Sequence, residues 1–184
     1  MLLVETNFAD YECTLEERLA ALPPSWRARA ERYRPLDKRL RSTVGYTMLA
    51  LILQTLYEET ALPEIQTDEH GKPYFVDCPL HFSISHCKAA VACAVDIVPV
   101  AVDVQDMLTD VSPTLAARIA APDDAAKLSA AELTARWTQK EASAKLDGRG
   151  ISIGLENLPM EYHRLEIKIQ DTYVVCTAYQ ESED

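Results

Sequence analysis

The 184-residue sequence contains five cysteines, and no two of them are spaced as a CxxC pair. A zinc site or a disulfide framework is therefore not expected, and a reducing compartment is predicted. No apolar run is long enough to cross a membrane, and the first ten residues lack the basic and small-residue signals of a secretory leader. We expect a cytoplasmic protein that does not associate with membranes.

Basic residues are also scarce, with 18 Lys and Arg against 29 Asp and Glu, for a formal net charge of −11. This balance argues against bulk binding of nucleic acid, which requires a basic surface. Seven of the 18 basic residues nevertheless lie in one stretch, RARAERYRPLDKRLR, from Arg27 to Arg41. The stretch is compatible with a small anionic ligand, although taken alone it is better explained as a solvated helix face.

The hydrophobic periodicity predicts an α+β protein with two comparable halves. In the first half we expect an edge strand, a helix capped by Thr14, a basic helix reaching Tyr33 and a long helix capped by Asp37. The remaining predicted elements are strands at residues 80–85, 90–95 and 98–104, helices at 113–121 and 130–145, and a hairpin of strands at 165–169 and 173–179.

The segment VAVDVQD places two polar side chains in a strand-like run. Residues of a strand alternate between its faces, so Asp103 and Gln105 point to the side opposite Val102 and Val104. A carboxylate beside an amide offers two hard oxygen ligands, which suits Mg²⁺ at a phosphate site. An acid at the exposed end of a strand is the simpler explanation when the segment is considered alone.

Two further segments combine turn residues with groups that can bind phosphate. In FSISH, a strand brings Ser85 and His86 to its carboxyl end, where a satisfied polar turn is an equally good explanation. The two side chains do not form a nucleophilic dyad, because neighbours on a strand face apart. In Gly71-Lys72-Pro73, the glycine and proline hold the lysine in a defined turn.

The stretch RWTQKEASAK is strongly helical. At helical spacing Trp137, Glu141 and Lys145 share one face, and Lys140 flanks them. An ion pair between Glu141 and Lys145 accounts for these two residues structurally. It does not account for the tryptophan on the same face.

These segments occur in a specific order: DKRLRS, GKP, FSISH, VDVQ and WTQKEASAKLDGRG. In this order they resemble the 4′-phosphopantetheinyl transferases, specifically the Sfp-type, pseudo-dimeric branch. The resemblance extends from about Arg27 to Ser152, and the segments 137–145 and 82–86 are its most specific parts.

The resemblance implies a fold of two similar halves related by pseudo-twofold symmetry, here residues 1–98 and 99–184, with a ligand cleft between them. It implies transfer of the phosphopantetheine arm of coenzyme A to a serine of an acyl or peptidyl carrier protein, with release of 3′,5′-ADP. Mg²⁺, or Mn²⁺ in its place, is the implied metal. A monomer is expected, and fatty acid, polyketide, nonribosomal peptide and siderophore pathways all remain open.

The resemblance also assigns roles to residues. Asp103, Gln105 and Glu141 match metal ligands, and Glu141 is the expected base, acting directly or through metal-bound water. Lys145 matches the lysine beside the pyrophosphate and is the second expected catalytic residue. The remaining positions expected to bind coenzyme A share a polar or turn-forming character: Arg41, Lys72, Pro73, Ser85, His86 and Lys140. Arg29 aligns only loosely with this set.

Two departures from the family pattern motivate an alternative. Gln105 stands where this branch often has glutamate, which predicts weaker metal binding, and only 34 residues follow Gly150. A non-catalytic module that binds coenzyme A or a carrier protein is therefore the second hypothesis, and another Mg²⁺-dependent phosphoryl enzyme is the third. An acidic carrier would need a local basic and apolar patch, which we expect near Arg118 and Lys127.

Overall fold

The computed structural model describes residues 1–58, 61–120, 127–148 and 163–180. The chain is an α+β protein built from helices and antiparallel sheets. The elements up to residue 96 are β1 (Leu2–Glu5), α1 (Ala9–Cys13), α2 (Leu15–Ala21), α3 (Pro24–Ala30), α4 (Leu36–Leu56), β2 (Ile65–Thr67), β3 (Pro73–Phe75), β4 (His81–His86) and β5 (Val91–Asp96). They are followed by β6 (Val100–Asp106), α5 (Pro113–Ile119), α7 (Ala130–Asp147), β7 (His163–Ile169) and β8 (Tyr173–Gln180).

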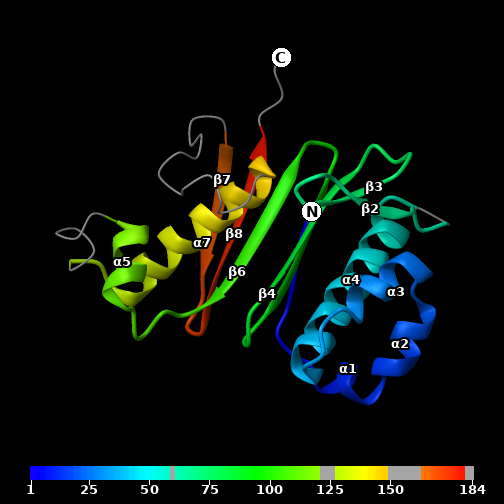
Figure 1. Cartoon of the computed structure of the whole chain (residues 1–184), viewed down its shortest axis with the longest axis horizontal. Coiled ribbons are helices and arrows are strands. Elements are labelled where there is room, and N and C mark those ends of the chain that lie inside the picture. Colours follow the sequence, from blue (N-terminus) through cyan, green and yellow to red (C-terminus); the bar gives the residue numbers. More distant parts are fainter. Residues whose placement is uncertain (59–60, 121–126, 149–162, 181–184) are drawn as a thin grey trace.

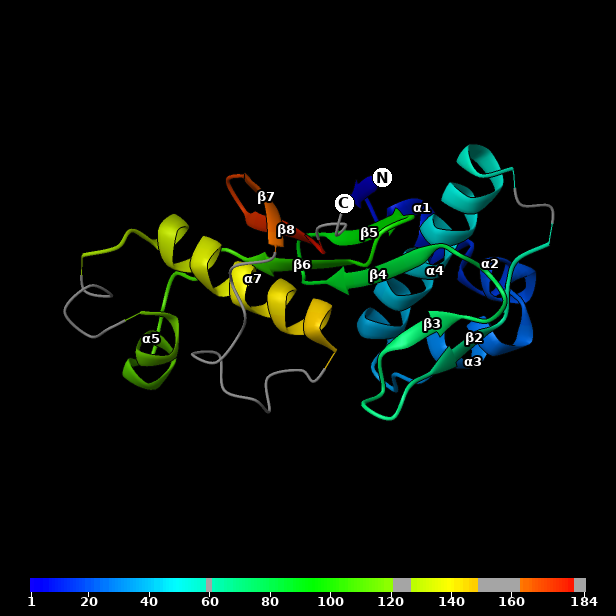
Figure 2. The same ribbon diagram turned by 90° about the horizontal axis from the view of Figure 1, so that it is seen from above.

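Two three-stranded antiparallel sheets form the centre of the molecule. Their strand orders are β1-β5-β4 and β6-β8-β7, while β2 and β3 pair separately. In the view from above, β4, β5 and β6 run side by side (Figure 2). The polar ends of β4 and β6 therefore lie near each other. Ser85 and Asp103, which are 18 residues apart in the chain, are joined by a hydrogen bond.

Helix α4 covers the first sheet and forms the larger core with α2 and α3. Trp26, Leu49 and Ile52 are fully buried there. Gly45 allows the helix to approach β4 closely, because a Cβ at this position would lie 2.5 Å from Cγ2 of Ile84. A larger residue would push the helix away from the strand that carries Ser85.

Helix α7 packs against the second sheet. Ala142 and Leu146 contact Ala101 and Cys176 in a small buried cluster. The helix begins with a capping box, in which Ser129 and Glu132 satisfy each other's backbone N–H groups. It ends at Gly148, whose φ of +89° is favourable for glycine. Both ends are therefore fixed by local sequence, which sets the position of the face bearing Trp137.

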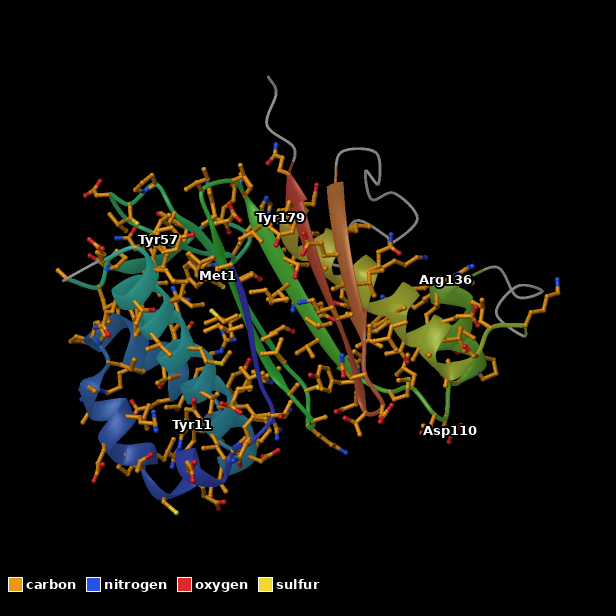
Figure 3. All side chains as sticks on the ribbon, turned by 180° about the vertical axis from the view of Figure 1, so that it is seen from behind. Met1, Tyr11, Tyr57, Asp110, Arg136 and Tyr179 are labelled. Carbon is orange, nitrogen blue, oxygen red and sulfur yellow. The ribbon has the colours of Figure 1, made fainter. Side chains whose placement is uncertain are left out.

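The helices lie at opposite ends of the molecule. Figure 1 shows α1 to α4 on one side of the strands and α5 and α7 on the other. In the side-chain view, Tyr11 and Tyr57 mark the first end and Asp110 and Arg136 the second (Figure 3). The strands that carry the polar segments lie between these two groups of helices.

The structure confirms the α+β class, the main strands and the C-terminal hairpin. The expected N-cap at Asp37 is wrong, because Pro35 precedes the helix and Asp37 lies in its first turn. The basic helix ends at Ala30 and not at Tyr33. The short elements α1, β2 and β3 were not predicted, since three to five residues carry little periodicity. The long helix ends at Leu56, and the helix expected at 113–121 ends at Ile119. The turn glycine Gly150 lies outside the described residues.

In the described part of the chain, no helix combines the length and the apolar character that a membrane span requires.

Candidate functional site

The main cavity has a volume of about 590 Å³ and is lined by residues from β4, β6, α7 and the turn before β3. It contains most of the residues singled out in the sequence. These are Lys72, Pro73, Ser85, His86, Asp103, Gln105, Trp137, Glu141 and Lys145. Segments distant along the chain, from Arg32 to Gly148, thus meet around one cavity.

Strand β6 and helix α7 supply the acidic groups. Asp103 and Gln105 both line the cavity, as their alternation along the strand predicted. Glu141 faces them from α7, one turn after Trp137. Burial, and then the negative charge of Asp103, raises the pKa of Glu141 above its usual value. A carboxylate with a raised pKa is a better proton acceptor than an exposed one.

Lys145 lies against Asp103, and both residues line the cavity. Its Nζ donates to Asp103 Oδ1 at 2.7 Å, to Ser85 Oγ at 2.8 Å and to the carbonyl oxygen of Val102 at 3.2 Å. All three N–H donors of the ammonium group are therefore used by protein acceptors. In this arrangement the lysine neutralises a carboxylate that is itself buried.

The acidic groups fit a divalent cation. Among the described residues, no three His, Cys, Asp or Glu side chains gather in a metal-binding group. Two carboxylates and an amide do line the cavity, and Mg²⁺ commonly uses only one or two carboxylates with water and phosphate oxygens. Asp103 Oδ2 is buried and has no hydrogen-bond partner in the described part of the chain. A buried oxygen of this kind is suited to binding a cation.

Lys72 connects the turn before β3 to the end of α7. Its Nζ donates to the carbonyl oxygen of Leu146 at 2.8 Å, in the last turn of the helix. Burial lowers the pKa of Lys72 below its usual value. Gly71 has a φ of +84°, so the predicted requirement for glycine in this turn is met. The lysine lines the cavity and also binds the C-terminal end of α7, where the helix dipole favours a cation.

His86 lies at the end of β4 against a residue that the sequence reasoning missed. The ring of Tyr33 meets the imidazole edge-on, with 5.6 Å between ring centroids. Arg32 donates to the hydroxyl of Tyr33 at 2.7 Å, and both residues line the cavity. Both residues belong to the basic stretch that begins at Arg27. The concentration of basic residues was compatible with an anionic ligand, but it did not indicate which residues of the stretch face the cavity.

His86 gives the protein a pH-dependent stability. Burial, followed by the charges of Arg41 and Lys145, lowers the pKa of His86 to about 4. The unfolded chain then binds more protons than the folded one between about pH 4 and pH 6.5, so stability falls as the pH is lowered through this range. We expect His86→Gln to reduce the loss of unfolding free energy between pH 7 and pH 4.5 by about 2 kcal/mol.

Urea unfolding at several pH values measures this difference. The matched control is His70→Gln, because His70 is an exposed residue on the turn before β3. Equal pH dependence for wild type and His86→Gln would contradict the prediction.

Two predicted ligand-binding residues do not line the cavity. Arg41 pairs with Asp37, one turn away on α4, at 2.6 Å, and its side chain is only 12% exposed. Lys140 donates to the carbonyl oxygen of Arg118 at 2.9 Å and so holds the end of α5. Other members of the basic stretch also make structural contacts, since Arg27 binds the carbonyl oxygens of Leu19 and Ala20. Several basic residues of the stretch from Arg27 to Arg41 are therefore explained by contacts within the protein rather than by a ligand.

The protein has an α+β fold, and its cavity is lined by both acidic and basic side chains. The curated relatives of the chain have a single activity in their names. The 4′-phosphopantetheinyl transferase Sfp of Bacillus subtilis (strain 168) is 24% identical over 173 residues, which are 88% of this chain and 77% of that protein. The 4′-phosphopantetheinyl transferase psf-1 of Bacillus pumilus is 34% identical over 143 residues, which are 71% of this chain and 60% of that protein.

A third relative, the 4′-phosphopantetheinyl transferase ffp of Bacillus subtilis, is 24% identical over 162 residues, which are 82% of this chain and 72% of that protein. No protein-family model matches the chain. The relatives confirm the resemblance found in the sequence: the chain is a homologue of the Sfp-type 4′-phosphopantetheinyl transferases. At the level of the family, this homology supports a transferase.

Proposed function

We propose that the protein transfers the 4′-phosphopantetheine arm of coenzyme A to a serine of an acyl or peptidyl carrier protein and releases 3′,5′-ADP. One observation carries the proposal. In a homologue of these transferases, Asp103, Glu141 and Lys145 meet in a cavity that also contains Lys72 and His86. Acidic and basic groups are thus combined where a diphosphate and its counter-ion would both need partners.

The proposal extends to the architecture. Residues 1–98 and 99–184 are taken as two halves with pseudo-twofold symmetry, with coenzyme A in the cleft between them. Each proposed half contains one three-stranded antiparallel sheet and a long helix that packs on it, α4 in the first and α7 in the second. The cavity is lined by strands of both sheets, which supports this placement.

The proposed chemistry follows from the charges in the cavity. The serine oxygen forms a bond to the phosphorus next to the pantetheine, and the bond from that phosphorus to the oxygen of the adenosine phosphate breaks. Glu141 accepts the serine proton, and its raised pKa supports this role. Lys72 and His86 bind phosphate oxygens of coenzyme A, beside the turn that contains Pro73. Lys145 stabilises the negative charge that develops on the pyrophosphate.

Asp103 and Glu141 would hold Mg²⁺ or Mn²⁺, with Gln105 as a neutral oxygen donor directly or through water. When bound, the cation supplies charge that neutralises the phosphate oxygens. The unpaired Oδ2 of Asp103 supports this assignment. Arg41 and Lys140 are assigned less direct roles, because both already have partners outside the cavity.

Intact-mass measurement of a carrier protein tests the proposal. Apo carrier incubated with the protein, coenzyme A and Mg²⁺ is expected to gain the mass of one phosphopantetheine arm, and a carrier whose acceptor serine is replaced by alanine is expected to gain none. Unchanged mass across fatty acid, polyketide and peptide carriers would contradict it. Binding of coenzyme A in calorimetry without any transfer would favour the alternative of a non-catalytic binding module, which Gln105 motivates.

A further inference from the structure

The two central sheets meet along β4 and β6 without a backbone ladder. The strands belong to different hydrogen-bonded sheets, and two serine hydroxyls connect them. Ser83 Oγ accepts the N–H of Val102 at 3.0 Å, and Ser85 Oγ accepts the N–H of Val104 at 3.2 Å. The backbone N–H groups of the two residues that flank Asp103 are therefore bound by side chains of β4.

The two serines differ in what else they contact. Ser83 has no further contact with Asp103 or Lys145 among the hydrogen bonds of the described residues. Ser85 Oγ, in contrast, donates to Asp103 Oδ1 at 2.9 Å and accepts from Lys145 Nζ at 2.8 Å. A hydroxyl has one donor and two acceptor positions, so Ser85 is fully satisfied by protein groups. It is also 93% buried, since its relative exposure is 7%.

We propose that Ser85 is a positioning residue for Asp103 and Lys145, and that it is not a ligand of the 3′-phosphate of coenzyme A. Its hydroxyl holds Oδ1 of the carboxylate together with the ammonium group, which leaves Oδ2 as the carboxylate oxygen without a partner. A phosphate oxygen could be bound by Ser85 only after one of these contacts was broken. The assignment deepens the proposed function and rests on it for the identity of the ligand.

The serine pair provides a matched experiment. Ser83→Ala and Ser85→Ala each leave one backbone N–H of β6 without its acceptor, so both are expected to lower the melting temperature by several degrees. Only Ser85→Ala also releases Asp103. Its dissociation constant for Mn²⁺, followed by electron paramagnetic resonance, is expected to rise about 10-fold. Ser83→Ala is expected to stay within about 2-fold of wild type, and Ser85→Thr, which keeps the hydroxyl, is expected to restore most of the affinity.

A second measurement distinguishes a positioning role of Ser85 from binding of the 3′-phosphate. Calorimetry gives the affinity for coenzyme A and for dephospho-coenzyme A, which lacks the 3′-phosphate. The ratio of the two affinities is expected to be the same in wild type and Ser85→Ala. A ratio that falls towards one in Ser85→Ala would show a contact with the 3′-phosphate and overturn the proposal. Equal Mn²⁺ affinities in Ser83→Ala and Ser85→Ala, or no Mn²⁺ binding by wild type, would also overturn it.

These outcomes are distinct from failure of the proposed function. Neither measurement uses a carrier protein or depends on turnover. If carriers are never modified while Ser85→Ala loses Mn²⁺ affinity and keeps the affinity ratio, the function is wrong and the positioning role stands. If carriers are modified and the affinity ratio collapses, the function stands and Ser85 is a ligand of the 3′-phosphate.

Discussion

Replacing Glu141 by glutamine is expected to reduce arm transfer at least about 100-fold, which is the lower end of the contribution of a general base. The glutamine keeps the shape of the side chain and removes its ability to accept a proton. The affinity for coenzyme A should change little, because other residues are proposed to bind its phosphates. Initial rates of carrier modification, together with calorimetry for coenzyme A, measure the two effects.

The same substitution is expected to stabilise the metal-free protein at neutral pH. Since burial and the charge of Asp103 raise the pKa of Glu141, the folded state keeps this proton to a higher pH than the unfolded chain does. Stability is therefore lost as the pH rises through the range above the unfolded value of about 4.5. Glutamine removes this loss, so Glu141→Gln should melt higher than wild type at pH 7.5 and equally at pH 4.

Glu132 on the same helix is the matched control. Hydrogen bonds from Ser129 lower the pKa of Glu132, so its carboxylate favours folding above its unfolded pKa, and the effect is lost as the pH falls. Glu132→Gln should therefore show no gain in melting temperature at pH 7.5 and full transfer activity. Normal turnover by Glu141→Gln would exclude Glu141 as the base, and a lower melting temperature would contradict the electrostatic explanation.

Replacing Lys145 by methionine is expected to cost both activity and stability. The substitution leaves Asp103 as a buried carboxylate without its cation, and Asp103 is only 6% exposed. Breaking a fully buried pair typically costs about 3–5 kcal/mol, but the Lys145 side chain is 35% exposed and partly screened by water. We therefore expect a loss of about 2 kcal/mol in the free energy of unfolding and at least a 100-fold loss in transfer.

A second substitution distinguishes the charge from packing. Asp103→Asn in the Lys145→Met background removes the unpaired charge and should recover about half or more of the lost stability, while activity stays absent. Urea unfolding of the two single variants, the double variant and wild type at one pH closes the cycle. If the loss of unfolding free energy in the double variant equals the sum of the losses in the two single variants, the ion pair does not have the proposed role.

The sequence was sufficient to place the side chains of β6 and α7 that line the cavity. Asp103 and Gln105 follow from strand alternation, and Trp137, Glu141 and Lys145 from helical spacing, because each pattern fixes the direction of the Cβ atom. Long side chains were less predictable. Arg41 and Lys140 can reach several partners, and they bind Asp37 and the carbonyl oxygen of Arg118, the second of which is 22 residues away.

Contacts between segments distant in the chain could not be predicted from periodicity. Nothing in the local pattern indicates that Ser83 and Ser85 would accept hydrogen bonds from β6, or that Lys72 would bind the end of α7. Such contacts depend on how the sheets pack. The two serines lie two residues apart on a strand, so the sequence indicates that they share a face. It does not indicate that this face contacts β6.

Product stoichiometry tests the central claim most directly. With apo carrier, coenzyme A and Mg²⁺, the amount of 3′,5′-ADP released is expected to equal the amount of carrier that gains one phosphopantetheine arm, throughout the time course. Arm transfer without 3′,5′-ADP, release of 3′,5′-ADP without modified carrier, or the absence of both would contradict the assignment of this protein as a phosphopantetheinyl transferase.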